Sequence, residues 1–239
     1  MTLKQSLLLL ILWLPMAVCA QQVGKPATTS TSGWYIGADA GISLGRSTFS
    51  SFSVDKTRVG FGFGLLGGYH INNYLSLEGE VKYSHLSLGT YDCCQNLYLA
   101  SDGNRYYAPL AGANNYLYSD LQSSVDMYQV GLRMNIDFIR LFRPDSRWSF
   151  LVSPTIYDIC AKATVKTIED THSVWNPGRE LLFGAGADLG MGYQINNRVN
   201  IRLYTGVIGI MGGGIDALPQ TEHTGGCVWN TGAKVTFAL

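Results

Sequence analysis

Hydrophobic and polar residues alternate along most of the chain with a period of two. In the first such segment the apolar side chains are Trp34, Ile36, Ala38, Ala40, Ile42 and Leu44, and small or polar residues stand between them. This period is typical of a β-strand whose two faces meet different surroundings. We therefore expect strands with one apolar face and one small or polar face.

The pattern recurs in segments of about ten residues that begin near residues 34, 59, 75, 128, 148, 181, 199 and 229. Tilted strands of roughly this length cross a membrane. Tight turns at Asn72-Asn73 and Asn196-Asn197 alternate with longer connections at about 46–57, 88–124, 158–179 and 211–226. The sequence therefore predicts an all-β fold, an eight-stranded antiparallel up-and-down transmembrane β-barrel over residues 34–239, with the long loops outside.

The first residues have the pattern of an export signal. Lys4 precedes an apolar run from Leu7 to Val18, and Val18-Cys19-Ala20 is a plausible cleavage site. Acylation of Cys19 is the alternative, against which the bulky Val18 argues. We expect a signal peptide at 1–20 and a flexible segment at 21–33. No later apolar stretch reaches about 18 residues, so a membrane location requires a closed barrel.

The composition also supports a transmembrane barrel. Charged residues make up 14% of the 239 residues, whereas soluble domains have about 25%. A water-facing surface needs charge, so the low content points away from a soluble enzyme. The net charge is zero, and nothing indicates nucleic acid as a partner.

Alternation alone does not say which face points outward, and a soluble barrel with an apolar interior is the alternative. Small residues on the second face suit the crowded interior of a narrow barrel. The charges on that face nearly balance, as a closed interior requires: Asp39, Glu78, Glu80, Asp137 and Asp188 against Lys82, Arg133, Arg202 and Lys234. We expect these side chains to form a charge network that plugs the lumen; a proton or ion path is the other interpretation.

Aromatic residues on the apolar face favour a membrane. Residues near the turn-side ends of the strands predict a girdle at one membrane interface: Trp34, Tyr69, Phe138, Trp148, Tyr193 and Phe237. A second set is placed to form the other girdle: Phe61, Tyr83, Tyr128 and Trp229.

Several short motifs resemble the small outer-membrane β-barrel family of opacity-like and OmpX-like proteins. They are Gly33-Trp34-Tyr35-Ile36-Gly37, the hairpins Gly68–Asn73 and Gly192–Asn197, Leu75–Glu80, and a last strand that ends the chain. Leu239 departs from the aromatic residue usual in that family, and Phe237 lies on the same face. The resemblance implies a Gram-negative outer-membrane location, with outer-membrane lipid and the barrel-assembly machinery as partners. It leaves function open, because this fold hosts adhesins, structural proteins and lipid-modifying enzymes.

His85 and Ser87 share the apolar face near the outer end of their strand. This pair resembles the site of the lipid A deacylases, in which a histidine oriented by a carboxylate activates a serine. Leu88 stands where that family has Asn, and no orienting acid is evident on the same face. A polar pair at headgroup level is the simpler interpretation, so we expect no enzyme. A changed lipid A profile in cells that express a His85→Ala variant would favour the enzyme.

After the signal segment the chain holds Cys93, Cys94, Cys160 and Cys227, all on the expected outer side. An even number in an oxidising compartment fits two disulfides, with Cys93 and Cys94 reaching different partners. The spacing fits no usual metal site, and we expect no cofactor.

The second long connection is rich in tyrosine, which gives large contact area at low entropic cost. These tyrosines either bind a partner or pack the loops together. The sequence thus favours surface binding, adhesion or an envelope-structural role, with an extracellular protein or glycan as candidate ligand. A lipid-modifying enzyme and a small pore are the alternatives.

Overall fold

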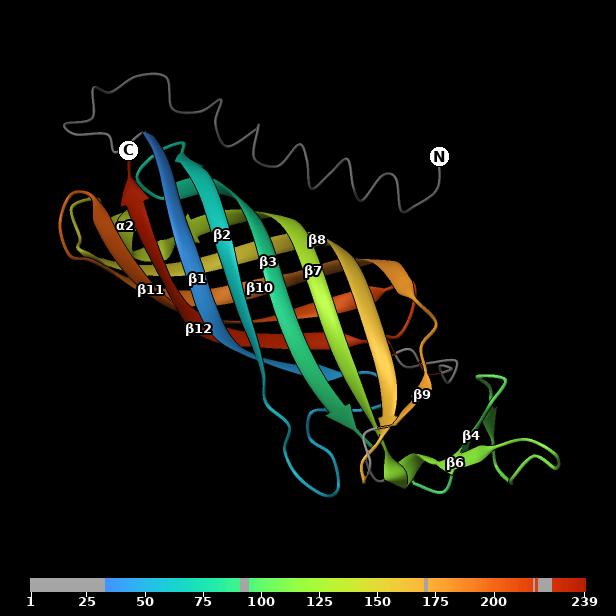
Figure 1. Ribbon diagram of the computed structural model, residues 1–239. Helices are drawn as coiled ribbons and strands as arrows, with labels where there is room; N and C mark the ends of the chain where they lie inside the picture. The colour runs from blue at the N-terminus through green and yellow to red at the C-terminus, as the bar shows by residue number, and fades with distance from the viewer. Residues whose placement is uncertain (1–32, 91–94, 170–171, 217, 219–224) are drawn as a thin grey trace. The chain divides into compact units, whose positions relative to one another are not determined.

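The computed structural model describes residues 33–90, 95–169, 172–216, 218 and 225–239. Eight long strands in it form a closed antiparallel barrel (Figure 1). They are β1 (Gly33–Arg46), β2 (Gly60–His70), β3 (Leu75–Gly89), β7 (Leu121–Asp137), β8 (Trp148–Thr167), β10 (Arg179–Gln194), β11 (Val199–Met211) and β12 (Cys227–Ala238). Each strand pairs with the next along the chain, and β1 with β12 completes the ring. The predicted fold class is confirmed.

Short turns join the strands at the end of the barrel that carries the C-terminus. The side chain of Asn72 accepts hydrogen bonds from the amides of Tyr74 and Leu75 at 3.0 and 2.8 Å. Asn196 does the same for the amides of Arg198 and Val199. Asparagine stabilises such tight turns through these local bonds. The third connection is the one-turn helix α2 (Phe138–Phe142), whose first amides are capped by Asp137.

Longer connections lie at the opposite end. They include a small sheet of β4 (Tyr98–Ala100), β5 (Arg105–Tyr106) and β6 (Asn115–Leu117), a 3-10 turn at Tyr118–Asp120, and β9 (Ser173–Trp175), which pairs with the end of β8. Figure 1 shows β3, β7 and β8 running on to this end. These strands are longer than expected: β7 begins at Leu121 and β8 continues to Thr167. The predicted loop bounds at 88–124 and 158–179 were wrong.

The apolar face of the strands points outward. Large exposed side chains include Ile36, Phe63, Leu65, Val81, Val130, Leu132, Leu189 and Leu203. The small and charged residues between them are buried inside. Among the described residues, no helix is long and apolar enough to cross a membrane. The predicted signal peptide and flexible segment fall outside the described residues, apart from Gly33.

Aromatic side chains gather at the turn end of this outer surface. The rings of Trp34 and Tyr69 pack edge-on with centroids 5.2 Å apart, and those of Trp148 and Tyr193 lie 4.9 Å apart. Both pairs join neighbouring strands. Toward the outer end, Tyr83 and Tyr128 form a similar cross-strand pair at 5.3 Å. Amphipathic rings at both ends of an apolar band are typical of membrane interfaces.

Candidate functional site

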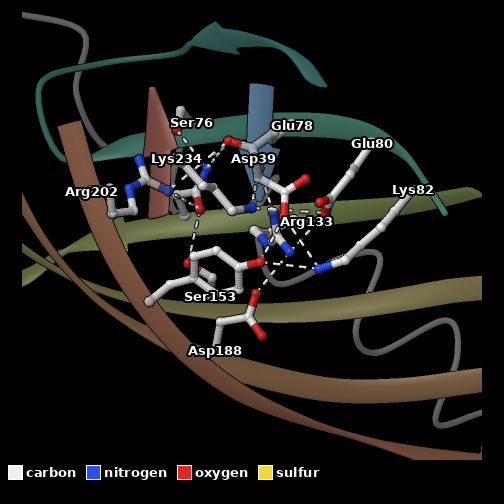
Figure 2. A network of polar contacts seen from close by, with 12 residues as sticks. Asp39, Ser76, Glu78, Glu80, Lys82, Arg133, Ser153, Asp188, Arg202 and Lys234 are labelled. Carbon is white, nitrogen blue, oxygen red and sulfur yellow. Dashed lines mark hydrogen bonds and ion pairs between the residues drawn. The ribbon is translucent and has the colours of Figure 1, made fainter. Parts of the chain in front are cut away.

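Arg133 lies at the centre of a charge network inside the barrel (Figure 2). Its guanidinium donates a hydrogen bond to Glu78 at 2.5 Å. It also forms ion pairs with Glu80 at 2.8 Å and with Asp188 at 2.7 Å. The same group donates to the hydroxyl of Tyr157, which in turn donates to Glu80. One cation therefore joins carboxylates from β3 and β10 across the lumen.

Two lysines extend the network. Lys234 Nζ lies 3.2 Å from Glu78, and Lys82 Nζ lies 3.2 Å from Asp39. Tyr204 connects the two halves, because its hydroxyl donates to Asp39 at 2.6 Å and Lys234 lies 4.9 Å above its ring. Paired charges of this kind are needed when ionised groups leave water.

The network brings together eight of the nine charged residues predicted to face the lumen. Four acids, Asp39, Glu78, Glu80 and Asp188, face four bases, Lys82, Arg133, Arg202 and Lys234. Their formal charges therefore cancel. Asp137 lies apart, at the turn end, where it caps α2 and pairs with Arg140.

Glycines make room for these long side chains. A Cβ on Gly206 would overlap the carboxylate of Asp188, and one on Gly131 would overlap the ring of Tyr157. The small residues of the inner face thus accommodate the large ones opposite them. This close fit explains part of the high glycine content.

Above the charges, toward the loop end, the interior becomes apolar. Inward-facing residues from six strands form this outer tier: Leu86, Leu88, Val125, Met127, Ile159, Ala161, Ala163, Val165, Leu182, Ile208, Ile210 and Val228. Loop residues pack on them from above, namely Phe49, Leu97, Leu99, Tyr118, Ile215 and Leu218. The lumen therefore has a charged inner tier beneath an apolar outer tier.

At this level the outward face of the strands changes from apolar to polar, and the inward face changes from polar to apolar. On β3, outward Tyr83 and inward Ser84 are followed by outward His85 and inward Leu86. On β7, outward Asp126 and inward Met127 mark the same change. A soluble β-structure has apolar residues inside and polar residues outside, whereas a membrane barrel has the reverse. The exchange therefore marks the upper limit of the outward-facing apolar band.

Strand length agrees with this limit. The 20 residues of β8 span about 65 Å at roughly 3.3 Å per residue. Tilted by about 45°, the strand rises roughly 45 Å, whereas the apolar band of an outer-membrane barrel is about 25 Å tall. The outer part of β8 therefore stands above that band.

His85 contacts the carboxylate of Asp126. Its Nδ1 lies 2.8 Å from Asp126 Oδ1, and the hydroxyl of Tyr83 donates to the same oxygen at 2.7 Å. The expectation that no acid shares its face was wrong, because the long connection between β3 and β7 hides their register. Ser87 faces outward two residues further on, and its hydroxyl makes no hydrogen bond to His85 within the described part of the chain.

Of the predicted disulfide residues, Cys160 and Cys227 are free thiols. Each lies on the outward face of its strand, on β8 and β12, which are separated by β10 and β11. Cys93 and Cys94 lie outside the described residues. Disulfides involving these two therefore stay a prediction.

The loop tyrosines divide between the two roles considered. Tyr118 is fully buried against Phe49, with ring centroids 5.4 Å apart. Tyr107 is 82% exposed. Tyr106 donates to Asp102 at 2.7 Å and so stabilises its own hairpin. Packing therefore accounts for some of these residues and leaves Tyr107 available for contact.

A buried carboxylate joins the outer loops. Asp216 accepts hydrogen bonds from the amide of Phe49 at 2.6 Å and the hydroxyl of Ser47 at 3.2 Å. Its own carbonyl accepts from Ser123 of β7 at 3.0 Å. Burial raises the pKa of Asp216 to about 6, because these neutral partners do not replace the lost hydration of the charged form.

This geometry predicts pH-dependent packing of the loops. The folded pKa of Asp216, about 6, lies above the ordinary value of 3.8, so protonation favours the packed form. The cost of burying the carboxylate is complete above pH 6 and fades as the pH falls toward 3.8. The NMR shift of the Phe49 amide should therefore titrate with a midpoint near 6. Asp216→Asn should abolish that titration, and a midpoint at the ordinary aspartate value would contradict the account.

The chain belongs to a known family. The model of the outer membrane protein β-barrel domain matches residues 7–238. No curated protein matches the chain.

Solved structures of small barrels are similar in fold. Neisserial surface protein A is 15% identical, with a TM-score of 0.49, and the match covers 89% of this chain and 100% of that one. Ail, the attachment invasion locus protein of Yersinia pestis, is 12% identical, with a TM-score of 0.42 and coverage of 87% and 100%. The N-terminal β-barrel domain of Pseudomonas aeruginosa OprF is 12% identical, with a TM-score of 0.41 and the same coverage.

Proposed function

We propose that this protein lies in the outer membrane of a Gram-negative bacterium and acts through its outer surface, in binding or adhesion or as a structural part of the envelope. The filled lumen carries this proposal. Arg133 and its partners occupy the inner tier, and Phe49 and the other loop residues cover the apolar outer tier. An eight-stranded barrel is just wide enough for its own side chains, which supports a lumen without a continuous ion path through the described part of the chain.

The outer surface suits contact with other molecules. The strands continue above the apolar band, and the loops are packed on them through Asp216 and the apolar tier. A rigid scaffold that presents loops is a common arrangement for binding. Hydrolysis is not proposed for His85, because the Ser87 hydroxyl makes no hydrogen bond to it in the described structure.

Planar-bilayer recording tests the proposal. We expect the inserted full chain to give no discrete conductance steps, because both tiers close the lumen. Insertion is verified in the same preparation by the gel mobility of the unboiled protein, so that silence is not mistaken for failed insertion. Steady conductance steps would contradict the proposal and favour a small pore.

A further inference from the structure

Four outward-facing side chains form a row across four adjacent strands at the outer end of the barrel. The strand registers place His85 opposite Asp126, Asp126 opposite Lys162, and Lys162 opposite Arg179. Directly opposed residues of antiparallel strands have Cβ atoms about 5 Å apart. The row therefore spans about 15 Å of the outer surface, from β3 to β10.

An apolar row lies directly beneath it. Tyr83, Tyr128, Cys160 and Leu181 are opposed in the same order, two residues closer to the membrane band. The side chain of Leu181 is 87% exposed, as expected of a residue that faces lipid. The charged row thus stands where the apolar band ends, at the level of lipid headgroups.

The charges within the row are uneven. Asp126 is already bound by His85 and Tyr83. Lys162 and Arg179 are exposed and directly opposed. Lys162 also lies opposite Asp126 and interacts with its charge, but among the described residues neither cation makes an ion pair within 4.0 Å. Like charges directly opposite each other are destabilising. An anion bound between the two cations would relieve this repulsion.

We propose that Lys162 and Arg179 form a binding site for the phosphate group of a membrane-lipid headgroup. The arginine guanidinium matches phosphate oxygens in a bidentate geometry, and the lysine ammonium adds a second positive charge. A lipid bound here would lay its acyl chains along the apolar row that contains Leu181. The inference rests on the membrane location proposed above.

Native mass spectrometry of the full chain in neutral detergent tests the site. The probes are phosphatidic acid, which carries a phosphate monoester, and phosphatidylcholine, which has no net charge. We expect the Kd for the first phosphatidic acid to be lower than that for phosphatidylcholine. A cation near a membrane surface changes anionic binding by about fivefold. Because it removes two such cations, the double variant Lys162→Gln, Arg179→Gln should raise the Kd for phosphatidic acid by about 30-fold.

The matched control is Lys56→Gln, Arg105→Gln. It removes the same charge from outer connections beyond the barrel strands, and its Kd should stay within about twofold of the original. An equal rise of the Kd for phosphatidic acid in both double variants would overturn the proposal. So would the absence of a preference for phosphatidic acid over phosphatidylcholine.

Inorganic phosphate distinguishes a lipid from a soluble ligand. Excess phosphate should not displace phosphatidic acid, because it lacks the acyl chains that contact the apolar row. Full displacement would overturn the lipid assignment in favour of a soluble phosphate compound. Failure of lipid binding in a barrel that still shifts mobility on boiling would leave the proposed function standing. A chain with no such shift would contradict both the lipid site and the proposed function.

Discussion

Replacement of Arg133 by alanine is expected to lower the free energy of unfolding by about 3–5 kcal/mol, because removing one partner of a buried ion pair leaves uncompensated charge. Glu78, Glu80 and Asp188 would lose their shared cation. Urea titration of the barrel in lipid vesicles, followed by tryptophan fluorescence, measures the change. The temperature at which the folded gel band is lost should fall as well.

Two variants serve as controls for Arg133. Arg143→Ala removes an exposed arginine at the end of α2 and should change stability by less than about 0.5 kcal/mol. Arg133→Lys keeps the positive charge but loses the planar fork, so we expect an intermediate cost. A cost for Arg133→Ala below about 1 kcal/mol would mean that the network does not hold the barrel together.

Phe49→Ala should have the second large effect. The ring is fully buried in the apolar outer tier, edge-on to Tyr118. Removing a buried phenylalanine costs about 3–5 kcal/mol. The hydrogen bond from the Phe49 amide to Asp216 uses the backbone and is retained, so the loss reports on packing. We expect faster tryptic cleavage after Lys56 in the released loop, together with lower stability.

Phe52→Ala is the matched control in the same loop. That ring is 56% exposed, and its removal should change stability by less than about 0.5 kcal/mol. Equal cleavage rates in the two variants would contradict the packed outer tier. Because the charged inner tier is untouched, the Phe49→Ala barrel should still give no conductance.

The eight strands and the outward direction of their apolar face were predictable from the sequence. Their period of two continues over whole strands, and inward residues such as Glu78 and Arg133 stand among small neighbours. The tight turns followed from the asparagines, whose side chains bond the next amides. Local patterns of this kind need no knowledge of distant contacts.

The apolar outer tier is not predicted from the sequence, because the apolar positions move from the outward to the inward face near the end of the strand. On β8 the apolar positions move from outward Phe150 and Ile156 to inward Ile159 and Val165, so residues 158–167 resemble a loop in the sequence. A search for this change of phase would have found it. The contact between His85 and Asp126 depends on the register across a long connection, and sequence spacing does not determine that register.

The closed barrel is expected to lie in the outer membrane with its apolar face toward lipid. Gel mobility of the protein from an outer-membrane fraction, with and without boiling, tests it most directly. We expect a folded band that shifts on boiling, because the closed sheet resists detergent until heated. Recovery in the soluble periplasmic fraction with no shift would contradict it.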